Sequence, residues 1–148
     1  MALNWIPVVY TVALACACVF VFIKGGVTER TGAIIVGAAS VVTWLVMSPD
    51  ETVFHSLELW TLVVDTATWA AFLHLALTSN RFWPLWATAF QTVALITHIA
   101  VLIDPAIVPK AYAFGQGLWA YPILLTLLVG AERHRRLMAM QTRLPSPR

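Results

Sequence analysis

The chain has 148 residues, of which 60% are hydrophobic and only 11% are charged, and its formal net charge is +2. A soluble domain carries about 25% charged residues, and the mean hydropathy of this chain is +0.81. So much apolar surface exceeds what one water-soluble domain of this length can bury. These numbers exclude an ordinary soluble domain and indicate a protein whose solvent is lipid.

Five apolar runs follow one another along the chain, separated by short polar or proline-marked connections. A helix of about 20 residues crosses the roughly 30 Å hydrocarbon core of a bilayer. We therefore predict an all-α, polytopic transmembrane helical bundle with five transmembrane helices. It forms a single domain over 1–142, and a disordered basic tail follows at 143–148. The expected spans are 5–23, 32–48, 57–78, 84–103 and 111–131.

The first run lies where a signal peptide would lie, and that is the alternative interpretation of it. A signal peptide begins with a basic region, whereas residues 1–4 contain no lysine or arginine. We therefore expect an uncleaved helix. Cys16 and Cys18 lie within it, and side chains two residues apart on a helix point about 200° away from each other. A disulfide between these two cysteines is excluded on that geometry.

Local signals give four further expectations. Residues 27–31 should form a polar connection before the second span. Ala33 and Gly37 make a small-xxx-small pair that allows close helix approach in lipid, either within the chain or toward another subunit. Pro122 should kink the fifth span. Three tryptophans should lie near the membrane interfaces, as amphipathic indoles prefer: Trp60, Trp83 and Trp86.

The basic residues set the orientation of the bundle. With five spans and the N-terminus outside, only Lys110 falls on the outer side, and all other lysines and arginines fall on the cytoplasmic side. A lysine and arginine bias of this kind determines membrane orientation, so we expect a cytoplasmic C-terminus. Anionic lipid headgroups should contact Arg133, Arg135 and Arg136. The basic tail is too short to indicate binding of nucleic acid.

Asp65 and His98 are ionisable groups that lie within expected spans, both in the outer half of the membrane. At 1.5 Å per helical residue, Asp65 lies about 12 Å and His98 about 8 Å below the expected outer boundary. The third and fourth spans are joined by a short turn, so they should be antiparallel neighbours. We predict that Asp65 and His98 form a polar pair between these two spans, in which each side chain favours the charged form of the other.

A stripe of polar residues supports this pair. On the third span, His55 and Glu58 share a helical face with Asp65. On the fourth span, Gln91 shares a face with His98, and its depth places it nearer to His74. The stripe leads from the outer side of the membrane down to Asp65.

Three interpretations of these polar groups stay open. They can be satisfied interhelical hydrogen bonds that fix the packing, a proton- or cation-handling site open to the outside, or a metal site. Two histidines with carboxylates suit zinc in kind, and the metal candidates are His55, Glu58, Asp65 and His98. No cofactor is indicated. Haem between two histidines of one chain is disfavoured, because His74 and His98 lie at different depths; ligation shared with another chain stays open.

The functional hypotheses follow from these features. The sequence holds no glycine-rich phosphate loop, nucleophile elbow, CxxC or HExxH motif, so an enzyme is not indicated, and the outer stripe is the one candidate site for a membrane-embedded enzyme. The leading hypothesis is a structural or accessory subunit of the bacterial inner membrane that packs against other membrane subunits or further copies of itself. The alternative is a small oligomeric transporter, channel or ion-binding protein that uses Asp65 and His98.

Overall fold

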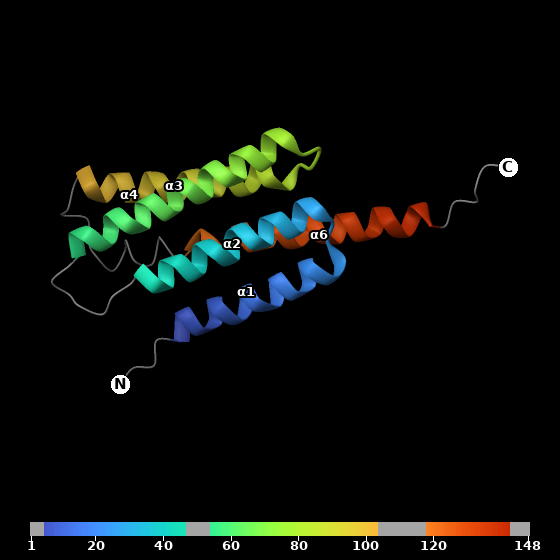
Figure 1. Cartoon of the computed structure of the whole chain (residues 1–148), viewed down its shortest axis with the longest axis horizontal. Coiled ribbons are helices and arrows are strands. Elements are labelled where there is room, and N and C mark those ends of the chain that lie inside the picture. The colour runs from blue at the N-terminus through green and yellow to red at the C-terminus, as the bar shows by residue number, and fades with distance from the viewer. Residues whose placement is uncertain (1–4, 47–53, 104–117, 143–148) are drawn as a thin grey trace.

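The computed structural model describes residues 5–46, 54–103 and 118–142. Over these residues the chain is helical and contains no strand, which confirms the all-α prediction. Figure 1 shows the helices lying side by side along the long axis of the molecule. They are α1 (Trp5–Lys24), α2 (Val27–Val46), α3 (Phe54–Thr78), α4 (Trp83–Ile103) and α6 (Ala120–Gln141).

The helices form a closed ring of neighbours. Each packs against the next in the order α1, α2, α3, α4 and α6, and α6 packs back against α1. The expected antiparallel pairing of the third and fourth runs is present as α3 and α4. The α1–α2 and α3–α4 turns lie at the same end of the bundle, where α6 also ends (Figure 1). This end carries Lys24, Arg30, Arg81, Arg133, Arg135 and Arg136, so it is called the basic end below.

Helix α2 begins earlier than the sequence analysis predicts. Residues 27–31, expected as a polar connection, form its first turn. The Glu29 side chain accepts a hydrogen bond from the backbone N–H of Gly26 at 3.0 Å, which is the glutamate half of a capping box. This bond satisfies an amide at the helix start, so the turn between α1 and α2 is reduced to Gly25 and Gly26.

Helix α6 also differs from the expected fifth span at 111–131. It begins at Ala120 and continues to Gln141, while residues 111–117 lie outside the described residues. Pro122 therefore sits in the first turn, where its missing amide hydrogen removes no helical bond. The expected kink at Pro122 stays a prediction, because most of the preceding part of the expected span lies outside the described residues. Beyond 131 the helix is supported by ion pairs from Glu132 to Arg135 and Arg136, at the spacing that stabilises helices.

Trp83 is the centre of packing near the basic end. It is only 6% exposed, whereas Trp60 and Trp86 are exposed. Trp83 lies at the end of the bundle, as expected of a residue near a membrane interface, but its indole is packed inside and does not face outward. A Cβ atom at Gly32 would come within 2.3 Å of the indole, and one at Gly130 within 2.4 Å. Only glycine leaves room for the ring at these two positions.

Within this chain, the two members of the expected small-residue pair on α2 do not both pack against a neighbouring helix. Ala33 is buried in the core, but a Cβ atom at Gly37 would meet nothing within 4 Å. Close approach to α2 occurs instead at Gly32, because that position faces Trp83. The core around it draws on every described helix and includes Ala17, Val21, Ala33, Phe72, Trp83, Ala87, Leu127 and Ala131.

The outside of the bundle is strongly apolar. In the described part of the chain, two helices contain segments long and apolar enough to cross a membrane, Pro7–Lys24 in α1 and Leu59–Thr78 in α3. Only 11% of each segment is buried, whereas the core helix of a soluble protein is mostly buried. Exposed side chains on α1 include Val8, Val12, Val19, Phe22 and Ile23.

Candidate functional site

The structure brings Asp65 of α3 and His98 of α4 together. Nε2 of His98 lies 2.7 Å from Oδ2 of Asp65. The His98 side chain is 3% exposed, whereas the Asp65 side chain keeps 24% of its surface exposed. The imidazole N–H can donate to the carboxylate in either charge state of the ring, so this contact holds a proton between two titratable groups. Whether the pair has a function beyond packing stays a prediction.

Gln91 is the third member of this polar cluster. Its Nε2 donates to Oδ1 of Asp65 at 3.0 Å, so both carboxylate oxygens of Asp65 are hydrogen-bonded. The expectation that Gln91 lies nearer to His74 is wrong, and His74 is exposed. Gln91 and His98 are two helical turns apart on α4, and Asp65 lies between them in depth, within reach of both.

Neighbouring residues extend the contact between α3 and α4. Nε1 of Trp69 donates to the Thr92 hydroxyl at 2.9 Å, one turn below Asp65 on α3. His55 and Glu58, the outer members of the expected stripe, lie in α3, but their side chains fall outside the described residues. Among the described side chains, no group of three metal-ligating residues is present.

A second buried acid, Glu29, lies at the basic end and was not predicted from the sequence. Its side chain is fully buried. In addition to the Gly26 amide, Glu29 accepts a hydrogen bond from Nε1 of Trp83 at 3.2 Å. Nε of Arg81 lies 3.7 Å from the same carboxylate oxygen. A buried carboxylate is tolerated only when it is paired and hydrogen-bonded in this way.

Arg81 connects this acid to α6. Its Nη2 lies 2.9 Å from Nδ1 of His134. A guanidinium group can only donate hydrogen bonds, so Nδ1 must accept and the imidazole carries its proton on Nε2. Glu29, Arg81 and His134 therefore link α2, the α3–α4 turn and α6 in one chain of contacts. We call Glu29, Arg81, Trp83 and His134 the Glu29 cluster.

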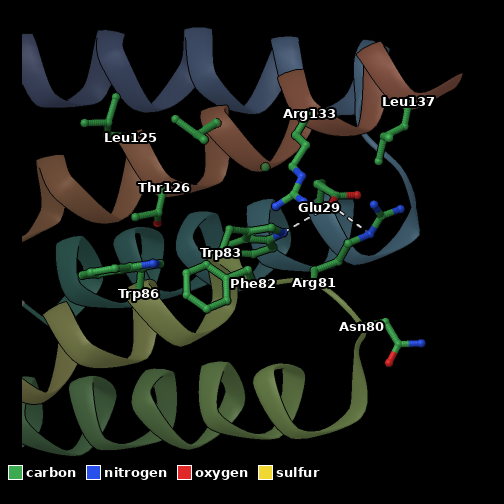
Figure 2. Close-up of a pocket in the computed structure, with 12 residues that line it drawn as sticks. Glu29, Asn80, Arg81, Phe82, Trp83, Trp86, Leu125, Thr126, Arg133 and Leu137 are labelled. Carbon is green, nitrogen blue, oxygen red and sulfur yellow. Dashed lines mark hydrogen bonds and ion pairs between the residues drawn. The ribbon is translucent and has the colours of Figure 1, made fainter. Parts of the chain in front are cut away.

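A cavity of about 570 Å³ opens beside the Glu29 cluster. Figure 2 shows Trp83 and Arg81 directed toward Glu29, and Arg133 pointing from α6 into the same space. In this view (Figure 2) the charged residues Glu29, Arg81 and Arg133 lie on the right of the cavity, and Trp86 and Leu125 lie on the left. The lining residues are Glu29, Asn80, Arg81, Phe82, Trp83, Trp86, Leu125, Thr126, Val129, Gly130, Arg133 and Leu137.

The three arginines expected to contact lipid headgroups differ in their surroundings. Arg135 and Arg136 both donate to the Glu132 carboxylate at 2.7 Å. These hydrogen bonds, the one from Arg135 first, lower the pKa of Glu132 from its ordinary 4.5 to about 2. Arg133 has no such partner among the described residues and lines the cavity instead.

No protein-family model, curated protein or solved structure matches this sequence.

Sequence reasoning missed Glu29 because the residue was assigned to a loop. The signal that could have found it is the spacing of Glu29 three residues after Gly26, which is the position of a capping-box acid in a helix that begins immediately after a Gly-Gly turn. Its pairing with Trp83 and Arg81 depends on tertiary packing of the α3–α4 turn over α2. No local pattern in the sequence contains that information.

Proposed function

We propose that the chain is a five-span protein of the bacterial inner membrane, with its basic end in the cytoplasm, that acts as an accessory subunit in a larger membrane assembly. The apolar exterior supports the membrane part of this proposal, because valine, phenylalanine and leucine side chains cover the outer faces of α1 and α3. The described cations gather at one end of the bundle, as the lysine and arginine rule for cytoplasmic loops requires.

The observation that supports an accessory role is the exposed apolar face of α2. Ile34, Val41 and Leu45 are exposed there at helical spacing, and Gly37 lies between them with open space above it. A glycine on an exposed apolar face lets a second membrane helix approach closely. The acids Glu29 and Asp65 are hydrogen-bonded within the chain, which fits a role in holding the helices together. The apolar face of α2 has no such role within the chain, so it is the surface proposed for a partner.

The test is purification in mild detergent, with identification of the membrane proteins that co-elute in fixed proportion. Gly37→Leu fills the open space at Gly37 on α2 and should abolish co-elution of the partner. Val12→Leu, on the exposed face of α1, should leave co-elution unchanged. A homo-oligomer that Gly37→Leu dissociates would identify the partner as a second copy. Elution of the wild-type chain as a lone monomer, or equal effects of the two variants, would contradict the accessory role.

Asp65 and His98 support a second candidate function, proton or cation binding. The observation that favours it is the partial exposure of Asp65 beside a buried imidazole 2.7 Å away. This candidate predicts pH-dependent proton flux or cation binding between pH 5 and 8 in liposomes that contain only this chain, and loss of that signal in Asp65→Asn. Absence of flux and binding in the wild-type protein would eliminate it.

A further inference from the structure

The cavity beside the Glu29 cluster is built from two kinds of wall. Arg81 and Arg133 stand at the basic end, and Trp86, Leu125 and Val129 continue the lining toward the middle of the bundle. Leu125 is eight residues before Arg133 on α6, which separates them by about 12 Å along the helix axis. A ligand that follows this wall must therefore be charged at one end and apolar at the other.

The charges in the cavity favour an anion at the basic end. The carboxylate of Glu29 is compensated by Arg81, which lies 3.7 Å away. Arg81 also contacts Nδ1 of His134 at 2.9 Å. Arg133 is thus left as one uncompensated cation that lines the cavity, and none of the described residues forms an ion pair with it. A guanidinium in this position is suited to bind a phosphate group through two parallel hydrogen bonds.

The apolar half of the cavity indicates the source of such a ligand. Trp86, Leu125 and Val129 are exposed large apolar residues, so the cavity opens onto the outer surface of the bundle. In the proposed topology this surface lies in the cytoplasmic leaflet, where anionic lipids are found. A small soluble anion would leave the apolar half of the cavity uncovered, whereas the acyl chain of a lipid would cover it.

We propose that this cavity binds one anionic phospholipid, with its phosphate on Arg133 and an acyl chain along Trp86, Leu125 and Val129. This inference rests on the proposed membrane topology. It differs from general attraction of anionic lipid to the basic end, because it assigns recognition to Arg133 alone among the arginines of α6. Arg135 and Arg136 are engaged with Glu132 and do not line the cavity.

Native mass spectrometry of the full chain in detergent tests this site. The probes are phosphatidylglycerol, which is anionic, and phosphatidylcholine with the same acyl chains, which is zwitterionic. We expect one phosphatidylglycerol to be retained in preference to phosphatidylcholine. Arg133→Gln should weaken phosphatidylglycerol binding about tenfold, which corresponds to loss of one charge-assisted contact. Arg136→Gln removes the same charge from the same helix and should change binding less than twofold.

A further variant and a competitor test whether the ligand must have an acyl chain. Val129→Trp places a large ring in the apolar half and should reduce phosphatidylglycerol binding while Arg133 stays in place. Glycerol phosphate, which carries the headgroup charge without acyl chains, should not displace the bound lipid. Each variant must keep the wild-type melting temperature in lipid-free detergent. If Arg133→Gln unfolds the chain, Arg133→Lys replaces it as the test, because it retains the charge and should keep part of the phosphatidylglycerol binding.

The outcomes separate this inference from the topology on which it rests. Equal losses in Arg133→Gln and Arg136→Gln, equal retention of the two lipids, or displacement by glycerol phosphate would each overturn the lipid site. Extraction of the wild-type protein from membranes by alkaline carbonate would instead overturn the proposed topology. Retention in carbonate-washed membranes without a preference for phosphatidylglycerol would leave the topology in place and overturn only the lipid site.

Discussion

Two acidic side chains inside this bundle, Glu29 and Asp65, are held in different ways. Glu29 has no exposed surface and is bonded by a backbone amide at the start of its own helix and by an indole from α4. Asp65 keeps about a quarter of its side chain exposed, and the bonds to its carboxylate come from Gln91 and His98 of α4. Glu29 depends on the positions of three parts of the chain, whereas Asp65 depends on one helix pair.

The two environments differ in how much the bundle loses when a polar contact is removed. A fully buried carboxylate has no water to replace a lost partner, so removal of its charge or of its donors carries a large cost. A partly exposed carboxylate can be solvated when a partner is removed. Loss of a partner should therefore cost most in the Glu29 cluster and less in the Asp65 cluster. It should cost least at Glu132, whose ion pairs are to arginines of its own helix near the end of α6.

The largest expected effect is that of Glu29→Gln. The neutral amide keeps the shape of the side chain but leaves Arg81 without its counter-charge and weakens the bonds from Gly26 and Trp83. The free energy of unfolding in detergent should fall by about 3 kcal/mol. Glu132→Gln is the control, because its ion pairs lie within one helix, and it should lower the unfolding midpoint far less. Equal shifts for the two variants would remove the distinction between an acid that joins helices and one that does not.

Gly130→Ala should give the next largest effect, because it disturbs the indole that bonds to Glu29. The added methyl group would meet the ring of Trp83 at 2.4 Å, and overpacking of this kind costs about 1–3 kcal/mol. Denaturation in detergent measures the loss, and fluorescence of the buried tryptophan should shift with it. Gly37→Ala is the control, since its Cβ has open space. A larger loss in Gly37→Ala than in Gly130→Ala would be inconsistent with the packing described around Trp83.

Asp65→Asn should have a smaller effect than Glu29→Gln. An amide oxygen still accepts one of the two bonds from α4, and the exposed part of the side chain remains solvated. We expect a loss of about 1 kcal/mol. A double-mutant cycle with His98→Gln measures the interaction of the pair, and the coupling should be about 0.6–1.7 kcal/mol. A coupling of zero would mean that the 2.7 Å contact contributes nothing to the association of α3 and α4.

The smallest expected effect concerns Glu132 and pH. Because Arg135 and Arg136 lower its pKa to about 2 from an ordinary 4.5, the ion pairs favour the folded end of α6. This contribution is fully present above pH 4.5 and is lost as the pH falls through 2. Carboxyl-carbon NMR of Glu132 should titrate near 2, and amide exchange after Arg133 should quicken only at the acid end. A titration midpoint near 4.5 would show that the arginine contacts are not maintained.

The extent to which the sequence predicted this molecule follows from the same comparison. The pairing of Asp65 with His98 could be deduced because a short turn forces α3 and α4 together and helical rise gives the depth of each residue. The contact of Gln91 with Asp65 was not deduced, because depth alone ignores the reach of a long side chain. The ends of α3 and α4 at Thr78 and Ile103 agree with the expected 57–78 and 84–103.

The remaining differences arise where tertiary contacts override local signals. Residues 27–31 look like a polar loop, yet Glu29 caps its own helix and is then covered by Trp83. The sequence does not show that the Trp83 side chain is buried, because the space for its indole is left by Gly32 and Gly130, which lie far from it in the sequence. The continuation of α6 beyond 131 depends on charge pairs that were interpreted only as headgroup contacts. Each of these outcomes needs partners that are far away in the sequence.

Cysteine labelling in spheroplasts tests whether the bundle spans the membrane with its basic end in the cytoplasm. In a background with Cys16 and Cys18 replaced by serine, Asn80→Cys places a thiol in the α3–α4 turn, and Asp50→Cys places one in the expected outer connection. A membrane-impermeant maleimide should label Asp50→Cys in spheroplasts and should label Asn80→Cys only after the membrane is permeabilised. Labelling of Asn80→Cys in intact spheroplasts would contradict the account.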